Sequence, residues 1–110
     1  MSDEIFFDEA FKSQLDAEAL LLMHMNRIAM FRDNNDKQYC SSIETFILLC
    51  PRYVRDKAME HIKDLGIKRG DYSNVTMEKK LIYDDLFVFV NELLEKQRMI
   101  WRKRQIRTFA

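Results

Sequence analysis

The apolar residues of this chain recur every three or four positions, which is the period of an α-helix with one buried face. Charged and polar residues fill the positions between them. The pattern is interrupted at three places, and it therefore predicts four helices, over residues 8–32, 36–49, 51–65 and 76–107. The expected fold is all-α, a compact four-helix bundle-like single domain over residues 1–110 with a long C-terminal helix.

The first predicted helix has one broad apolar face. Its main line is Phe7, Phe11, Leu15, Leu22, Met25 and Ala29, and this line is widened by Leu21 and Ile28. The polar segment from Arg32 to Asp36 ends the helix, because Asn and Asp side chains compete with helical hydrogen bonds. We expect the apolar face to pack into the core.

The two middle helices are expected to meet at Pro51. Asn35 or Asp36 can cap the earlier helix, and Pro51 ends it because proline disfavours helical geometry at the residue before it. Gly66 can end the later helix in a left-handed conformation. The expected core stripes are Tyr39, Ile43, Phe46, Ile47 and Cys50 in one helix, and Val54, Ala58, Ile62 and Leu65 in the other.

The last helix runs through a stretch without glycine or proline, and Thr76 is its expected cap. Its apolar stripe is broad enough to contact two neighbours, which predicts that this helix is the central one of the bundle. The stripe ends at Trp101 and comprises Ile82, Leu86, Phe89, Val90, Leu93, Ile100 and Trp101, widened by Tyr83, Phe87 and Leu94.

Composition agrees with an all-helical, folded chain. Two glycines and one proline in 110 residues leave too few turn residues for hairpins. No apolar run approaches the length of a membrane span, and the acidic start has no signal-peptide pattern. The two cysteines, Cys40 and Cys50, would lie about 15 Å apart along one helix, too far for a disulfide. We expect buried free thiols and a cytoplasmic location.

Charge is balanced in total but not along the chain. Lys and Arg number 18, as do Asp and Glu. Residues 1–20 hold six acidic side chains and one basic one, whereas residues 95–110 hold six basic side chains and one acidic one. Such a chain can pair its own ends or pair head to tail with copies of itself. The same distribution can also simply follow the helix dipole, with acids in a first turn and bases in a last one.

The basic end of the last helix is the candidate contact site. Arginine forms forked hydrogen bonds with carboxylate and phosphate, and tryptophan can stack on a base. The neutral total charge favours an acidic protein surface over nucleic acid, whose binding domains are usually basic overall. The candidate residues are Lys96, Arg98, Trp101, Arg102, Lys103, Arg104 and Arg107.

Catalytic, cofactor and metal motifs are not found in the sequence. His24 and His61 fall on different predicted helices, and no pair of His or Cys has metal-ligand spacing. We expect His24 on the flank of a helix and His61 exposed. Asp84 and Asp85 point about 100° apart on a helix, which fits a solvated face better than a catalytic pair.

Seven methionines are many for this length. We expect most of them to fill the core; the alternative is an adaptable surface that accepts other helices.

The combined hypothesis is a non-enzymatic helical binding or assembly module without a cofactor. It would be a small structural or adaptor subunit that self-associates or docks into a larger complex. The alternative is a small nucleic-acid-binding or regulatory protein that uses the basic end.

Overall fold

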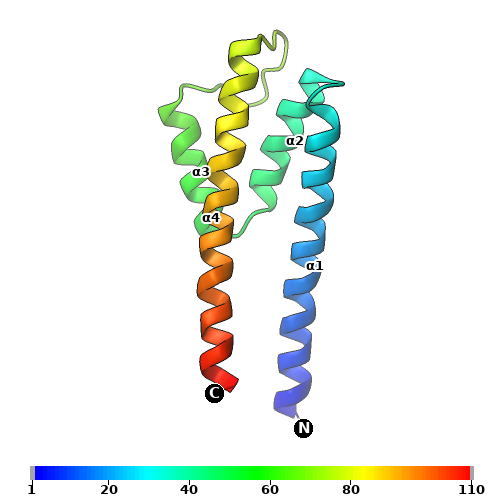
Figure 1. Cartoon of the computed structure of the whole chain (residues 1–110), viewed down its shortest axis with the longest axis vertical. Coiled ribbons are helices and arrows are strands. Elements are labelled where there is room, and N and C mark those ends of the chain that lie inside the picture. The colour runs from blue at the N-terminus through cyan, green and yellow to red at the C-terminus, as the bar shows by residue number, and fades with distance from the viewer. Residues whose placement is uncertain (1, 110) are drawn as a thin grey trace.

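The structure is a computed structural model that describes the backbone of residues 2–109 and the side chains of residues 16–100, 102 and 103. It confirms the all-α fold, with no strand among the described residues (Figure 1). The first helix begins six residues earlier than predicted, and the last ends two residues later. The four helices are α1 (Ser2–Phe31), α2 (Asp36–Leu49), α3 (Arg52–Asp64) and α4 (Met77–Phe109).

Local capping signals set the helix boundaries, as predicted. The Asn35 side chain accepts a hydrogen bond from the Gln38 amide at 3.2 Å, which caps α2. The Thr76 hydroxyl accepts one from the Lys79 amide at 3.1 Å, which caps α4. Before Pro51 the backbone is extended at Cys50, so α2 ends there and α3 starts on the far side.

The end of α3 is closed by a glycine in the left-handed conformation. Gly66 has φ 71°, and its amide donates to the Lys63 carbonyl at 3.1 Å. The Ile67 amide donates to the Ile62 carbonyl at 3.2 Å, and the Ile67 side chain packs against the core. This paired arrangement satisfies two carbonyls that the helix end would otherwise leave open.

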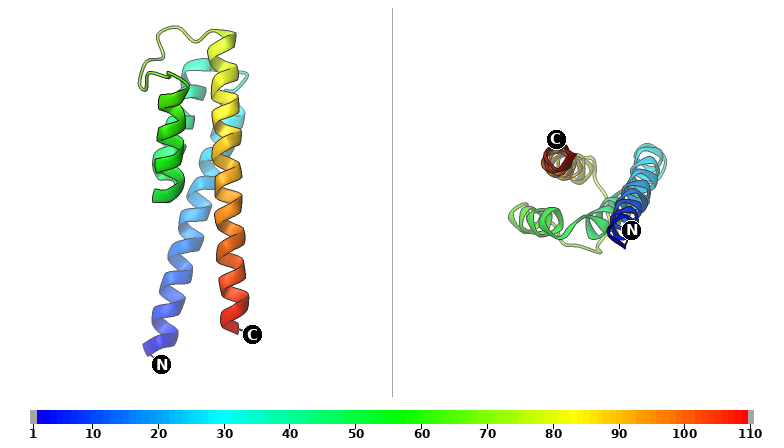
Figure 2. Two further views of the ribbon diagram at one scale, coloured as in Figure 1. Left: turned by 90° about the vertical axis from the view of Figure 1, so that its left-hand side faces the viewer. Right: turned by 90° about the horizontal axis from the view of Figure 1, so that it is seen from below.

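Helix α2 lies at the centre of the molecule and contacts the other three helices. Among the described residues, the backbone of α1 does not closely approach that of α3 or α4. The view along the helices shows this spacing (Figure 2). The prediction that the last helix is central is therefore wrong. The apolar stripe of α4 is broad because α4 packs against two helices, α2 and α3. Helix α2 packs against three helices, α1, α3 and α4.

The core stripes of α2 and α3 are as predicted, except that Leu65 is exposed. In α1 the predicted phase is wrong: Leu21 and Ile28 are buried, whereas Leu22 and Ala29 are exposed. The early part of that line, residues 7–15, lies outside the described side chains. In α4 the most buried side chains are Tyr83, Leu86, Val90 and Leu94.

Among the described side chains the buried core of α4 ends at Leu94, and Ile100 of the predicted stripe is exposed; the Trp101 side chain lies outside the described residues. The reason is the length of the neighbours, because α2 and α3 are short and meet at Pro51. Past this level only α1 and α4 continue, and both chain ends lie at the same end of the molecule (Figures 1 and 2). We call this two-helix part, residues 2–20 and 95–109, the stalk.

Candidate interaction surfaces

The basic end of α4 is partly engaged inside the chain. Arg98 forks onto Glu18 of α1, with Nη2 at 2.7 Å and Nε at 3.1 Å from Oε2, and it also reaches Glu95 at 3.4 Å. The hydrogen bond to Glu18 raises the pKa of the Arg98 guanidinium, although burial opposes the shift. Arg98 is thus held by the acidic segment of its own chain.

The remaining predicted contact residues divide into two groups. Lys96, Arg102 and Lys103 are exposed, and among the described residues they have no ion-pair partner. The side chains of Trp101, Arg104 and Arg107 lie outside the described residues. Helical spacing places Lys96 and Lys103 on one face of α4 with Met99 and Ile100, about 160° from Arg98. This face combines cations with exposed apolar side chains.

An exposed apolar surface lies on α1, on the side away from α2. We call it the α1 outer face. Leu22 is 58% exposed, Met23 45% and Met30 53%. The complete face, by helical spacing and exposure, consists of Ala19, Leu22, Met23, Asn26, Ala29 and Met30.

Two opposite charges flank the α1 outer face. Asp16 and Arg27 are both exposed, lie on the same flank by helical spacing, and have no ion-pair partner among the described residues. The long side chains Met23 and Met30 alternate along the face with the small residues Ala19 and Ala29. Small residues permit close approach of another helix, and methionine adapts its shape to what it meets.

Most of the described methionines lie on the surface and do not fill the core. Met23, Met30, Met77 and Met99 are exposed, while Met25 and Met59 pack against the core. The core-filling interpretation is wrong for the exposed four. The alternative interpretation from the sequence, an adaptable surface, agrees with the two methionines on the α1 outer face.

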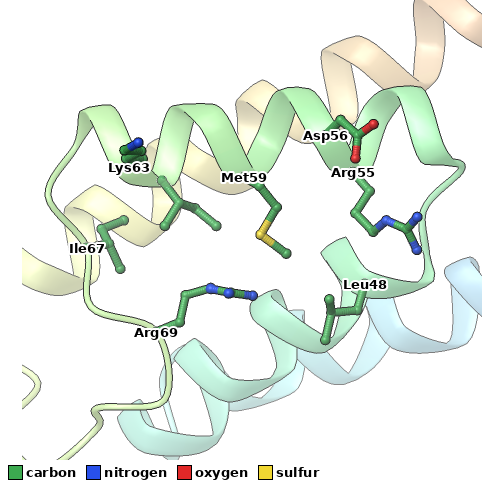
Figure 3. A pocket seen from close by; sticks show the side chains of 8 residues that line it. Leu48, Arg55, Asp56, Met59, Lys63, Ile67 and Arg69 are labelled. Carbon is green, nitrogen blue, oxygen red and sulfur yellow. The ribbon is translucent and has the colours of Figure 1, made fainter.

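A groove runs between α2 and α3 and is bordered at one end by the loop that joins α3 to α4 (Figure 3). It encloses about 540 Å³. A smaller recess of about 80 Å³ continues beside Arg69 toward Glu44. The floor of the larger groove is apolar and contains Leu48, Met59 and Ile62. Its rim carries the cationic side chains of Arg55, Lys63 and Arg69.

Glu44 is a buried carboxylate that the sequence did not reveal. The Tyr83 hydroxyl donates to its Oε1 at 3.1 Å, and the Gly70 amide lies 3.4 Å from its Oε2. Burial raises the pKa of Glu44, while these hydrogen bonds oppose the shift. Both oxygens thus join α2 to α4 and to the α3–α4 loop, which is a structural role. Glu44 is a single polar residue among the apolar core residues of α2, and nothing in the sequence indicates that its carboxylate is buried and hydrogen-bonded.

Asp84 is a second structural carboxylate. Arg32 donates to both of its oxygens, at 2.8 and 3.2 Å, and the Tyr39 hydroxyl donates to Oδ1. Burial would raise the pKa of Asp84, but the hydrogen bonds from Arg32 and Tyr39 outweigh it and lower the pKa. The predicted solvated face is correct for Asp85, which is exposed, and wrong for Asp84.

The histidines and cysteines form no cluster in the part of the chain that the structure describes. There, no group of three or more His, Cys, Asp or Glu side chains could hold a metal ion. His61 was expected to be exposed, but it is half-buried and stacks on Phe89 with 4.1 Å between ring centroids. Cys40 and Cys50 are free and buried, and burial raises their pKa to about 11 and about 12. Protonated thiols are poor nucleophiles.

No described helix carries an apolar stretch long enough to cross a bilayer. Comparisons of the chain with family models, with curated proteins and with solved structures find no match.

Proposed function

We propose that this protein is a non-enzymatic helical assembly module, a small structural subunit that pairs with a second copy through the α1 outer face. The observation that carries the proposal is the exposure of Leu22, Met23 and Met30 on one side of one helix. A contiguous exposed apolar surface on a folded domain is typical of an interaction site. Such a surface is self-complementary when a two-fold axis relates two copies.

Charge favours a second copy, arranged antiparallel, as the occupant. Asp16 and Arg27 lie on the same flank, about 8 Å to either side of a point between Leu21 and Leu22. A two-fold axis through that point brings Asp16 of one copy opposite Arg27 of the other, twice per dimer. The two charges that have no ion-pair partner among the described residues of one chain are thus complementary between two chains.

The expected dimer is weak. Fully burying a Leu or Met side chain contributes about 1.5–3 kcal/mol, so a half-exposed one contributes about 1 kcal/mol. Three such side chains from each copy give about 6 kcal/mol. That gain only modestly exceeds the lower estimates of the entropic cost of association, about 4 kcal/mol. Dimer formation should therefore depend on protein concentration.

The setting that we propose is a reducing one such as the cytoplasm. Its support is the pair of buried free thiols, Cys40 and Cys50, which make no disulfide. The chain can also act as an adaptor in a larger complex, because α4 carries a separate exposed face of cations and apolar side chains.

The second candidate is nucleic-acid binding by the basic end of α4. It is favoured by the exposed cations Lys96, Arg102 and Lys103, because such side chains contact phosphates. It is weakened by the ion pair that holds Arg98 to Glu18, since this acidic neighbour lowers the local positive potential.

Sedimentation velocity over a range of concentrations tests the proposal. The comparison is between the natural chain, Met23→Glu on the α1 outer face, and the control Leu81→Glu, a similarly exposed position on α4. We expect the natural chain and the control to dimerise and Met23→Glu to remain monomeric. A natural chain that stays monomeric while binding a nucleic-acid duplex with steep salt dependence would favour the second candidate instead.

A further inference from the structure

The groove between α2 and α3 combines an apolar floor with cations that form no ion pair among the described residues, although the Arg69 charge also acts on the buried Glu44 carboxylate. Arg55, Lys63 and Arg69 form no ion pair within the described residues. The acidic residue at the rim, Asp56, already lies 3.8 Å from Arg52. The rim is therefore positive beside the apolar side chains of Leu48 and Met59 (Figure 3).

The loop that carries Arg69 is held in place over the groove. The Gly70 amide contacts the Glu44 carboxylate, and Lys79 Nζ donates to the Asp71 carbonyl at 2.6 Å. The Asp71 side chain also accepts a hydrogen bond from the Ser73 hydroxyl at 2.7 Å. Arg69 points from this loop toward Met59 on the opposite wall (Figure 3). The cation is thus presented to the groove from a braced position.

We infer that the groove binds the acidic, aromatic segment Asp3–Phe11 of a second copy, an inference that rests on the proposed self-association of this chain. Charge complementarity selects this occupant. The segment places four acidic residues among four large apolar ones. Arginine pairs with carboxylates through forked hydrogen bonds, so a cationic rim over an apolar floor suits such a sequence. The acidic residues are Asp3, Glu4, Asp8 and Glu9, and the apolar ones Ile5, Phe6, Phe7 and Phe11.

Helical spacing of the segment agrees with this match. Phe7 and Phe11 are four residues apart, as are Glu4 and Asp8, so each pair lies one turn apart on neighbouring faces of a helix. Two aromatic rings can then meet the apolar floor while the two carboxylates beside them meet the rim.

The segment cannot reach the groove of its own chain. Helix α1 is continuous from Ser2 to Phe31, and its first half belongs to the stalk, which points away from the α3–α4 loop (Figures 1 and 2). A contact between the segment of one copy and the groove of the next is heterologous. It repeats from copy to copy, so it builds a chain or a ring. Together with the two-fold contact on α1, it would extend dimers into a larger assembly.

A labelled peptide tests the inference on the full chain. A fluorescent peptide of residues 2–15 is titrated with the protein at low salt, and its anisotropy is measured. Two control peptides carry either Asn and Gln in place of the four acids or Ala in place of Phe7 and Phe11. We expect the natural peptide to bind, and each control to bind at least tenfold more weakly.

Protein variants locate the site. Arg55→Glu with Arg69→Glu should weaken peptide binding at least tenfold, and the milder Arg55→Gln with Arg69→Gln guards against misfolding next to Glu44. The matched control, Lys37→Glu with Lys57→Glu, makes the same change of charge at exposed positions outside the groove and should bind within twofold of the natural chain. Circular dichroism checks the helical content of every variant.

The outcomes separate this inference from the proposed dimer. A natural chain that dimerises but does not bind the peptide, or whose groove variants bind it undiminished, overturns the inference and leaves the dimer standing. Equal binding of the neutral control peptide also overturns it. Peptide binding that is lost in the groove variants, by a chain whose self-association is unchanged by Met23→Glu, supports the groove and overturns the dimer on α1.

Discussion

Glu18 and Arg98 are 80 residues apart in the sequence, and they form an ion pair of 2.7 Å across the top of the stalk. Among the described residues the backbones of their helices do not approach closely, because α1 and α4 are each packed on α2. The pair therefore links the two stalk helices. It also shows that the acidic and basic segments of the chain meet within one molecule, at least at this point.

Removing either member of this pair should cost little stability. Both side chains are about a third exposed, and exposed ion pairs contribute at most about 1 kcal/mol. We expect a coupling energy of about 0.5–1 kcal/mol for the pair in a double-mutant cycle with Glu18→Gln and Arg98→Gln. Urea unfolding of the four proteins measures it, and additive effects of the two substitutions would show that the pair does not act as a unit.

A structural feature of this molecule can be predicted from the sequence when the residues that cause it are close together in the chain. The helix ends at Asn35, Pro51 and Gly66 follow from contacts within a few residues, so they were predicted correctly. Glu18, the main partner of Arg98, lies 80 residues away, and Gly70 and Tyr83, the partners of Glu44, lie 26 and 39 residues away. No local sequence pattern predicts contacts over such separations.

The phase error in α1 has a different cause. Leu21 and Leu22 are adjacent, about 100° apart, and α1 is apolar around both positions. Periodicity shows that a face is apolar but not what covers it. The line through Leu22 and Ala29 was assigned to the core, yet it lies on the exposed side. Under our proposal this line is apolar because a second copy covers it.

Asp84 should stabilise the fold except in strong acid. Its pKa is lowered in the folded chain, so the stabilisation is present above the pKa of the unfolded chain, about 3.9, and is lost as the pH falls through the lower folded value. We expect Asp84→Asn to reduce stability by about 1–3 kcal/mol at neutral pH, since Arg32 and Tyr39 lose an ionised acceptor. Urea unfolding between pH 7 and pH 3 should show the difference from the natural chain shrinking at the acidic end.

Glu44 should show the opposite dependence on pH. Its pKa is raised in the folded chain, so its favourable contribution is present below the unfolded pKa, about 4.3, and is lost as the pH rises through the folded value. Glu44→Gln removes the buried charge; its amide oxygen can accept from the Gly70 amide, and its NH2 group can donate to the Tyr83 oxygen. We expect this variant to gain stability relative to the natural chain between pH 4 and pH 7, measured by thermal unfolding. A constant difference over that range would contradict the role of burial.

The claim that two copies pair through α1 is tested most directly by exchanging the flanking charges. Asp16→Arg alone or Arg27→Glu alone places like charges opposite each other twice per dimer, so each should weaken dimerisation several-fold in sedimentation equilibrium at low salt. The double variant, Asp16→Arg with Arg27→Glu, restores opposite charges and should dimerise about as well as the natural chain. If the double variant is as weak as the single ones, or if the natural chain sediments as a monomer at every concentration, the antiparallel pairing of α1 is wrong.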